Sequence, residues 1–178
     1  PIYGCAYVTE STTLWSKKIM GPVKNMWDAK NYIKDAKMPI LWVNSNKDVH
    51  FSVNCTSKSY EATSGNSYMT IYPDLPHGQY NADILYGGIA NFADMAVKGK
   101  NCFLKIQEVS KPENNKFTVK YQQSAECYPV KAVLYAAKDS KPGYVSQDYI
   151  SDPTTVWQET DLKFENGVVS VETEPGYN

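Results

Sequence analysis

MPILWVNSNKDVHFS (residues 38–52) and YMTIYPDLPHGQY (residues 68–80) are the two segments that decide the fold. Each contains a short apolar run, ILWV in the first and YMTIY in the second, which is typical of a strand in a parallel sheet. Each run is followed by a polar or Pro-flanked turn, and the two turns carry Asp48 and His77. A helical pattern over residues 52–62 joins the two runs. The sequence therefore predicts a strand–helix–strand crossover with both turns at the same edge of the sheet.

The segments around this unit extend the α/β pattern. PIYGCA (residues 1–6) is typical of the end of a further buried strand, so we expect a partial parallel sheet. Helical spacing predicts helices over residues 10–20, 27–36, 52–62 and 84–97, with Ser52 as the N-cap of the third helix and Gly99 as the end of the last. The apolar residues expected to face inward in the second and third helices are Trp27, Tyr32, Ile33, Val53 and Tyr60.

The pattern changes near residue 100, where helical spacing gives way to short strands. Strands are expected over residues 103–109, 116–121 and 130–136, with turn residues between them. Asn166-Gly167, between two further apolar runs, is the strongest hairpin signal in the chain. We therefore expect residues 1–100 to be an α/β domain and residues 101–178 to be an all-β sandwich, of the immunoglobulin or fibronectin III kind.

Composition and charge exclude several classes of function. The chain has 178 residues and a formal net charge of −1, and all 18 basic residues are Lys. Without a basic field and without Arg, we expect neither nucleic acid nor a membrane surface as a partner. No apolar run approaches the roughly 20 residues that span a bilayer. The chain begins at Pro1, inside an apolar run, which indicates a fragment of a longer protein.

Four cysteines, at positions 5, 55, 102 and 127, show no CxxC spacing and no nearby His, so we expect no metal and no cofactor. Four cysteines allow three pairings, and the sequence does not choose among them. They are either buried thiols or include a bridge between Cys102 and Cys127, which would suit an exported protein.

Asp48 and His77 are the candidate catalytic residues. In α/β-hydrolases the order is Ser, then Asp or Glu, then His, each at the carboxyl end of a strand, and these two residues follow that order. Asp48 would orient the imidazole of His77, and His77 would take the proton of a Ser hydroxyl. Other roles remain open: Asp48 as a turn residue, His77 as a surface residue, and His50 as the base. No GxSxG or HGGG motif occurs, so a nucleophile must come from outside these residues.

Several runs carry a family resemblance. They are similar to the C-terminal half of α/β-hydrolases of the acetyl xylan esterase and dienelactone hydrolase-like group, and most of all to the PhoPQ-activated pathogenicity-related type, over residues 1–97. The runs are PIYGCAYV (1–8), WDAKNYI (27–33), PILWVNSNKD (39–48), KSYEA (58–62) and YMTIYPDLPHG (68–78). Asp48 and His77 match the positions of the acid and the base in that group. Ser45 stands where the group usually has Gly, and Gln79 stands where a second His is frequent.

The resemblance implies a parent enzyme that hydrolyses a small ester or an acetylated carbohydrate, with no cofactor, secreted or periplasmic in a bacterium. Two other functions stay open. The β-domain could be a carbohydrate- or protein-binding module that uses Tyr144, Tyr149 and Trp157, although Trp157 could equally be part of its core. The parent could also be a peptidase of the prolyl-oligopeptidase type. The open edge of a short parallel sheet could form a homodimer.

Overall fold

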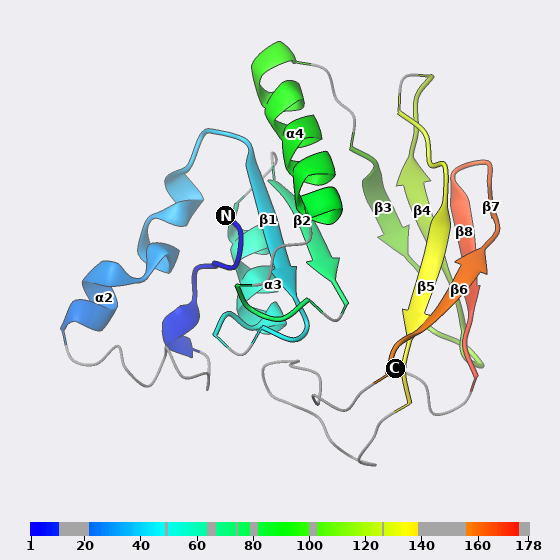
Figure 1. Ribbon diagram of the computed structural model, residues 1–178, viewed down its shortest axis with the longest axis horizontal. Helices are drawn as coiled ribbons and strands as arrows, with labels where there is room; N and C mark the ends of the chain where they lie inside the picture. Colours follow the sequence, from blue (N-terminus) through cyan, green and yellow to red (C-terminus); the bar gives the residue numbers. More distant parts are fainter. Residues whose placement is uncertain are drawn as a thin grey trace. The chain divides into compact units, whose positions relative to one another are not determined.

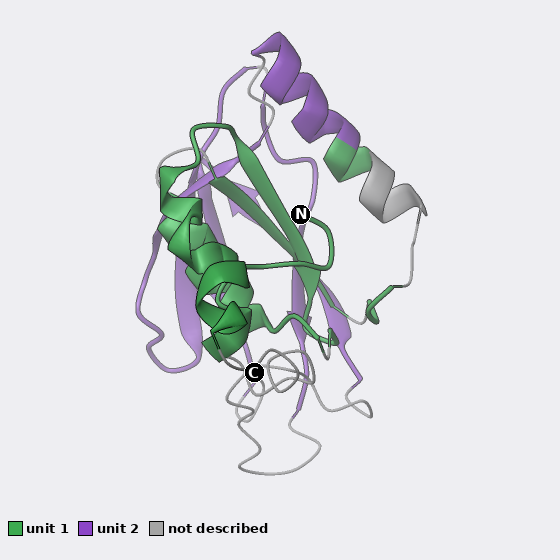
Figure 2. Cartoon of the chain, turned by 90° about the vertical axis from the view of Figure 1, so that its left-hand side faces the viewer, with its two compact units in different colours: residues 1–89, 145–153 green, residues 90–144, 154–178 purple. Residues whose placement is uncertain are grey.

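The computed structural model describes residues 1–10, 22–48, 50–63, 67–73, 75–78, 82–99, 103–125, 127–138 and 156–174 (Figure 1). The chain divides into two compact units (Figure 2). Unit 1 contains residues 1–89 and 145–153, and unit 2 contains residues 90–144 and 154–178. The expected domain boundary at residue 100 stays a prediction.

The core of unit 1 is the predicted parallel pair of strands. β1 (Ile40–Ser45) runs parallel to β2 (Ser67–Tyr72), with Ile40 opposite Ser67 and Ser45 opposite Tyr72. The N-terminal segment lies on the other edge of β1, where Ile2 makes an isolated parallel bridge to Val43. The expected third strand is thus reduced to a single bridge among the described residues.

Burial of β1 explains its apolar composition. Leu41, Trp42 and Val43 are each at most 6% exposed, because both faces of the strand are covered. The indole N–H of Trp42 donates to the hydroxyls of Thr63 and Ser67, at 3.3 and 3.1 Å. These bonds satisfy the one polar group of this large buried side chain.

The helix between the two strands begins and ends where the sequence predicts. α3 (Val53–Ala62) is capped by Ser52, whose hydroxyl accepts the backbone N–H of Cys55 at 3.2 Å. The prediction of its inward face is wrong for Tyr60, which is 40% exposed. The buried positions are instead Cys55, Thr56 and Ser59. Small side chains allow close approach, and the backbone N–H of Ala6 donates to the Ser59 hydroxyl at 2.9 Å.

The predicted helix over residues 27–36 is wrong. The structure has α2 (Val23–Trp27), then the 3₁₀ turns η2 (Ala29–Asn31) and η3 (Ile33–Asp35). Asp28 interrupts the helix because its backbone is extended and its carboxylate bonds to Tyr7 and Thr9 of the N-terminal segment. Trp27 and Tyr32, expected to face inward, are 53% and 59% exposed.

α4 (Ala82–Lys98) is the longest described helix and confirms the prediction for residues 84–97. Gly99 ends it with a φ of 70°, and its N–H donates to the carbonyl of Met95 at 2.9 Å. The helix predicted over residues 10–20 lies outside the described residues, apart from the single turn η1 (Val8–Glu10). No helix among the described residues combines the length and the apolar character that crossing a bilayer requires.

Unit 2 contains two antiparallel sheets. One has the strand order β3-β4-β8-β7 and the other is the pair β5-β6. The strands are β3 (Lys105–Val109), β4 (Lys116–Gln122), β5 (Ala132–Ala136), β6 (Gln158–Leu162), β7 (Phe164–Glu165) and β8 (Val168–Glu172). The β7–β8 hairpin is confirmed, and Asn166 and Gly167 adopt the positive φ that such turns require. The sequence did not predict β6 as a separate strand.

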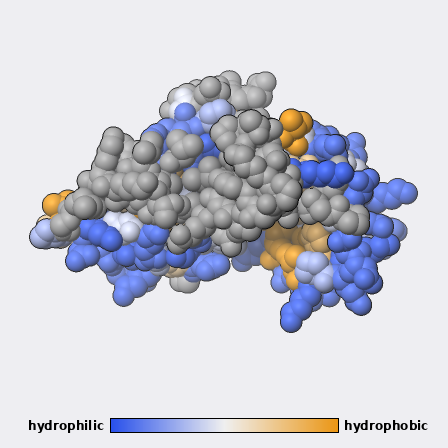
Figure 3. Space-filling model, turned by 90° about the horizontal axis from the view of Figure 1, so that it is seen from below, coloured by the Kyte–Doolittle hydropathy of each residue, from blue (hydrophilic) through white to orange (hydrophobic). Residues whose placement is uncertain are grey.

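The buried part of unit 2 is small. Its described buried apolar residues are Met95, Tyr121, Ala136, Ala137 and Val171. Several other apolar side chains on these strands and loops are exposed, including Ile106, Val109 and Val130, which are 60%, 58% and 86% exposed. Figure 3 shows such apolar surface beside hydrophilic surface.

Candidate functional site

The site lies in the two turns that follow the parallel strands of unit 1. β1 ends at Ser45 and β2 ends at Tyr72, and these two residues are opposite each other in the register. The turns that follow therefore start at the same edge of the sheet. Asp48 is in the first turn and His77 is in the second.

The structure brings the two predicted side chains together. The Nδ1 atom of His77 lies 2.9 Å from Oδ2 of Asp48, within hydrogen-bond distance. Asp48 is fully buried, whereas the side chain of His77 is 31% exposed. One end of the imidazole is thus held by a buried carboxylate while part of the ring remains accessible.

The second oxygen of Asp48 is occupied by its own turn. Oδ1 accepts the backbone N–H groups of His50 and Phe51, at 2.8 and 2.9 Å. These two bonds fix the carboxylate plane and leave Oδ2 for His77. In the tautomer that carries its proton on Nδ1, this nitrogen donates to the carboxylate and Nε2 keeps a lone pair. That is the tautomer a general base requires.

Among the described residues, three aromatic rings pack around the imidazole of His77. Its ring centroid lies 4.6 Å from that of His50, 5.3 Å from that of Tyr3 and 5.7 Å from that of Phe51. His50, the other candidate base, bonds to Asp48 through its backbone, and its ring packs edge-on against His77 at 80°. Sequence reasoning missed Tyr3 and Phe51. The prediction that residues 1–6 end a neighbouring strand was the one signal that could have placed Tyr3 here.

Asn44 and Ser45 organise the turn that carries Asp48. Both are buried, and the Asn44 amide donates to the carbonyl of Phe51 at 2.9 Å and to the hydroxyl of Thr56 at 2.7 Å. The Ser45 hydroxyl accepts the N–H of Lys47 at 3.1 Å. Ser45 is not among the described residues with positive φ, so this position does not need the Gly expected from the sequence resemblance. Gln79, the other departure, lies outside the described residues.

We expect Asn44→Ala to lower the free energy of unfolding by about 2 kcal/mol, because it leaves the Phe51 carbonyl and the Thr56 hydroxyl without this buried donor. Chemical denaturation of the chain measures this change. Asn54→Ala, at a half-buried position of the adjacent helix, is the matched control, with an expected change below about 0.5 kcal/mol. Equal losses in the two variants would contradict a special role for the Asn44 amide.

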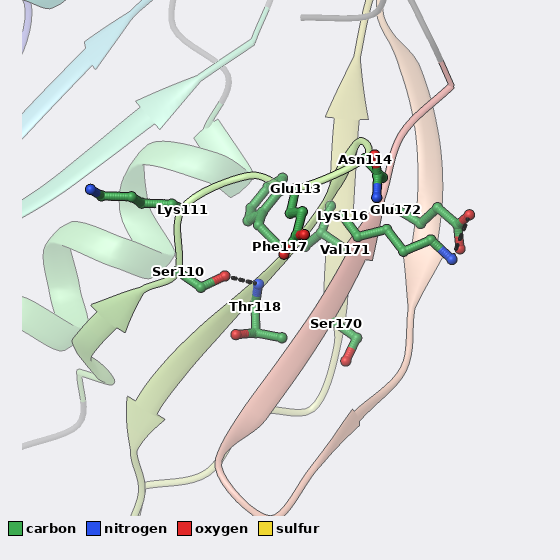
Figure 4. Close-up of a pocket in the computed structure, with 10 residues that line it drawn as sticks. All are labelled: Ser110, Lys111, Glu113, Asn114, Lys116, Phe117, Thr118, Ser170, Val171 and Glu172. Atoms are coloured by element: carbon green, nitrogen blue, oxygen red, sulfur yellow. Dashed lines mark hydrogen bonds and ion pairs between the residues drawn. The ribbon is translucent and has the colours of Figure 1, made fainter.

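A hollow lies on the four-stranded sheet of unit 2 (Figure 4). This hollow has a volume of about 870 Å³ and includes the turn between β3 and β4. Its lining includes Phe117, buried Val171 and the Lys116–Glu172 ion pair, whose charged atoms are 3.1 Å apart. The Ser110 hydroxyl accepts the backbone N–H of Thr118 at 2.8 Å, so it already has a hydrogen-bond partner within the sheet. Most of its polar residues are exposed, and no buried polar group points to a ligand here.

The remaining candidates from the sequence are only partly described. Tyr144 and Tyr149 lie outside the described residues, and Trp157 is half-buried. Among the cysteines, Cys55 is buried and Cys5 is half-buried, whereas Cys102 lies outside the described residues. Within the part of the chain that the structure describes, no cluster of His, Cys, Asp and Glu is placed to hold a metal ion.

Fold and site together define an α/β protein that presents a hydrogen-bonded Asp–His pair at the carboxyl ends of two neighbouring parallel strands. The model of the PhoPQ-activated pathogenicity-related protein family matches residues 6–144. The chain belongs to this family, which confirms that part of the resemblance and extends it beyond residue 97. No curated protein and no solved structure gives a significant match to the chain.

Proposed function

We propose that this chain is the acid–base part of a serine hydrolase that cleaves carboxylic esters. Asp48 orients His77, and Nε2 of His77 takes the proton of a Ser hydroxyl supplied from outside these 178 residues. The observation that carries the proposal is the 2.9 Å contact between Nδ1 of His77 and the buried carboxylate of Asp48, at aligned strand ends. The substrate we propose is a small ester or an acetylated carbohydrate.

The position of the pair supports a catalytic role over a structural one. The side chain of His77 is 31% exposed, so part of the ring is open to a reacting hydroxyl although its partner carboxylate is buried. The carboxylate is fully buried and receives three hydrogen bonds, two from its own turn and one from the imidazole. This arrangement stabilises the imidazolium that forms when a general base accepts a proton.

We further propose that unit 2 is a β-sandwich of the immunoglobulin or fibronectin III kind appended to the hydrolase unit. Its two antiparallel sheets, the tight β7–β8 hairpin and the approach of β6 to β8 support this proposal.

A fluorophosphonate probe, which labels an activated Ser, tests whether the nucleophile lies outside this chain while Asp48 and His77 lie within it. We expect the longer protein that includes this chain to be labelled on a Ser outside residues 1–178, and the isolated chain to show no labelling, because no described Ser bonds to His77. Mass spectrometry of the labelled peptides reads out the result. Labelling of a Ser within the 178 residues would overturn the assignment of the nucleophile.

A comparison of two substrates separates an esterase from a peptidase. An esterase should turn over 4-nitrophenyl acetate, whereas a peptidase of the prolyl-oligopeptidase type should turn over a Pro-anilide.

A further inference from the structure

Tyr3 belongs to the N-terminal segment that pairs with β1. The N–H of Val43 donates to the carbonyl of Pro1 at 2.9 Å, and the N–H of Tyr3 donates to the carbonyl of Val43 at 3.0 Å. Val43 is close to the carboxyl end of β1, so the N-terminal segment leaves this pairing near the turn that carries Asp48. These two hydrogen bonds fix the backbone position from which the side chain of Tyr3 starts.

The side chain of Tyr3 packs against the candidate base. Tyr3 is 8% exposed, and the centroid of its ring lies 5.3 Å from that of His77, with an angle of 61° between the two planes. The hydrogen bond to Asp48 holds the imidazole at a single atom, Nδ1, and this bond alone lets the ring tilt. An aromatic ring packed edge-to-face at this distance opposes such a tilt, because aromatic pairs prefer that geometry. Tyr3 therefore supplies a contact that the carboxylate does not.

The backbone of Tyr3 adopts a conformation that a bulky residue seldom takes. Its φ is 48°, in the left-handed region, where the Cβ atom of an L-residue crowds the following carbonyl oxygen. Glycine takes this conformation without that penalty. Such outliers persist only where the surrounding structure determines them, and they cluster at functional sites. The strained backbone and the buried ring together indicate that this position depends on its aromatic side chain.

We propose that Tyr3 is a positioning residue of the candidate site, whose ring holds the imidazole of His77 in the orientation in which Nε2 accepts a proton. This inference rests on the proposed function, because it assigns a role toward the proposed base. Tyr3 acts through His77 and takes no part in the proton transfer itself. A misplacement of the reacting groups by about 1 Å costs on the order of 100-fold in rate, so a contact that only orients the base affects turnover.

NMR of the full 178-residue chain tests the positioning without a nucleophile. In wild type, we expect a nuclear Overhauser effect between the ring protons of Tyr3 and those of His77, and a slowly exchanging Nδ1 proton on His77. Tyr3→Gly removes the ring and relieves the backbone, so it should raise the solvent exchange rate of this proton by about tenfold or more. Tyr3→Leu keeps an apolar side chain at the buried position and should give the same change, so the test stands if the glycine variant folds poorly. Tyr3→Phe keeps the ring and should leave the rate within about twofold of wild type.

Tyr7 provides a matched control in the same segment. Its φ is 60°, so it also adopts the left-handed conformation, and it is half-buried. Its N–H donates to Asp28 and its carbonyl accepts the thiol of Cys55, whereas Tyr3 bonds to β1. Tyr7→Gly should leave the exchange rate of the His77 proton within about twofold of wild type, although it changes the backbone in the same way. An equal rise for the two glycine variants would show a general loosening of the segment and would overturn the role of Tyr3, as would the absence of the Overhauser effect in wild type.

Kinetics separate this inference from the proposed function. In a protein that joins the chain to the proposed Ser nucleophile, Tyr3→Gly should lower kcat for 4-nitrophenyl acetate by about 10- to 100-fold and leave KM within about threefold, because it acts on the orientation of the base. Tyr3→Phe should retain at least about half of kcat. A loss in Tyr3→Phe as large as that in Tyr3→Gly would assign the effect to the hydroxyl and overturn the role of the ring. If the exchange rates change as expected but the wild-type protein turns over no ester, the packing of Tyr3 on His77 stands and the proposed function fails.

Discussion

In a protein that joins this chain to the Ser nucleophile we propose, replacing His77 with Ala should lower kcat/KM for 4-nitrophenyl acetate by on the order of 10⁴-fold or more. The imidazole is the one described side-chain base bonded to Asp48, and its loss leaves the nucleophile with no group to accept its proton. The loss should be in kcat, because the proton transfer occurs in the transition state. Steady-state kinetics with the ester measures it.

Two companion variants separate catalysis from packing. Asp48→Asn keeps the shape of the side chain but removes the charge that stabilises the imidazolium, so we expect a loss of about 10²- to 10⁴-fold. His50→Ala is the matched control, because His50 is the other histidine in the chain and touches the same ring. We expect its activity to fall by less than about tenfold. Comparable losses for His50→Ala and His77→Ala, or wild-type rates for His77→Ala, would contradict the proposed function.

The isolated chain offers a test that needs no nucleophile. The Nδ1 proton of His77, bonded to a buried carboxylate, should give a downfield proton resonance in NMR spectra. Asp48→Asn should remove this resonance, and His50→Ala should retain it. If the resonance is present but the longer protein has no esterase activity, the geometry holds and the function is different.

The site was predictable from the sequence where local patterns determine it. The apolar runs ILWV and YMTIY determine two strands, the first buried and the second half-buried, and a short crossover makes them parallel neighbours. The distance of each residue from the end of its strand then places Asp48 and His77 at one edge. This placement of the two residues can be predicted without knowing any other contact, because the register of parallel strands aligns their ends.

The rest of the site depends on contacts between segments far apart in the chain. Tyr3 reaches His77 across 74 residues, and Phe51 is placed by two hydrogen bonds, from its N–H to Asp48 and from Asn44 to its carbonyl. Apolar spacing also gave a wrong prediction at residues 27–36. The spacing there is helical, but the chain turns at Asp28. No local signal distinguishes an Asp near a helix N-terminus from an Asp that bonds to another segment.

The carboxylate of Asp28 accepts four hydrogen bonds. It is fully buried, and Oδ1 accepts the N–H groups of Tyr7 and Lys30, at 2.9 and 3.0 Å. Oδ2 accepts the N–H and the hydroxyl of Thr9, at 3.0 and 2.6 Å. A single carboxylate therefore joins the N-terminal segment to the turn after α2.

We expect Asp28→Ala to lower the free energy of unfolding by about 3–5 kcal/mol, because four donors lose their acceptor in a buried site. Asp28→Asn should cost nearly as much, since its amide would direct a donor at other donors. Glu10→Gln is the matched control: Glu10 binds Lys30 and Lys58 at 2.9 Å, but its side chain is 38% exposed. Its expected loss is at most about 1 kcal/mol. Urea denaturation measures the free energy of unfolding of the three variants and of wild type. If Asp28→Ala loses no more unfolding free energy than Glu10→Gln, this role of Asp28 is contradicted.

The same carboxylate makes the stability of the chain depend on pH. Burial alone raises the pKa of Asp28, but the hydrogen bonds from Thr9, Lys30 and Tyr7 together outweigh burial, so the folded pKa is lower than the ordinary value. A group with a depressed folded pKa stabilises the fold above its unfolded pKa of about 3.9, and this contribution is lost as the pH falls through the folded pKa. Wild type should therefore lose stability below about pH 4, and Asp28→Asn should lose less over that range, because its side chain does not titrate. Unfolding free energies measured from pH 7 to pH 3 compare the two, and parallel curves would show that Asp28 is not the group responsible.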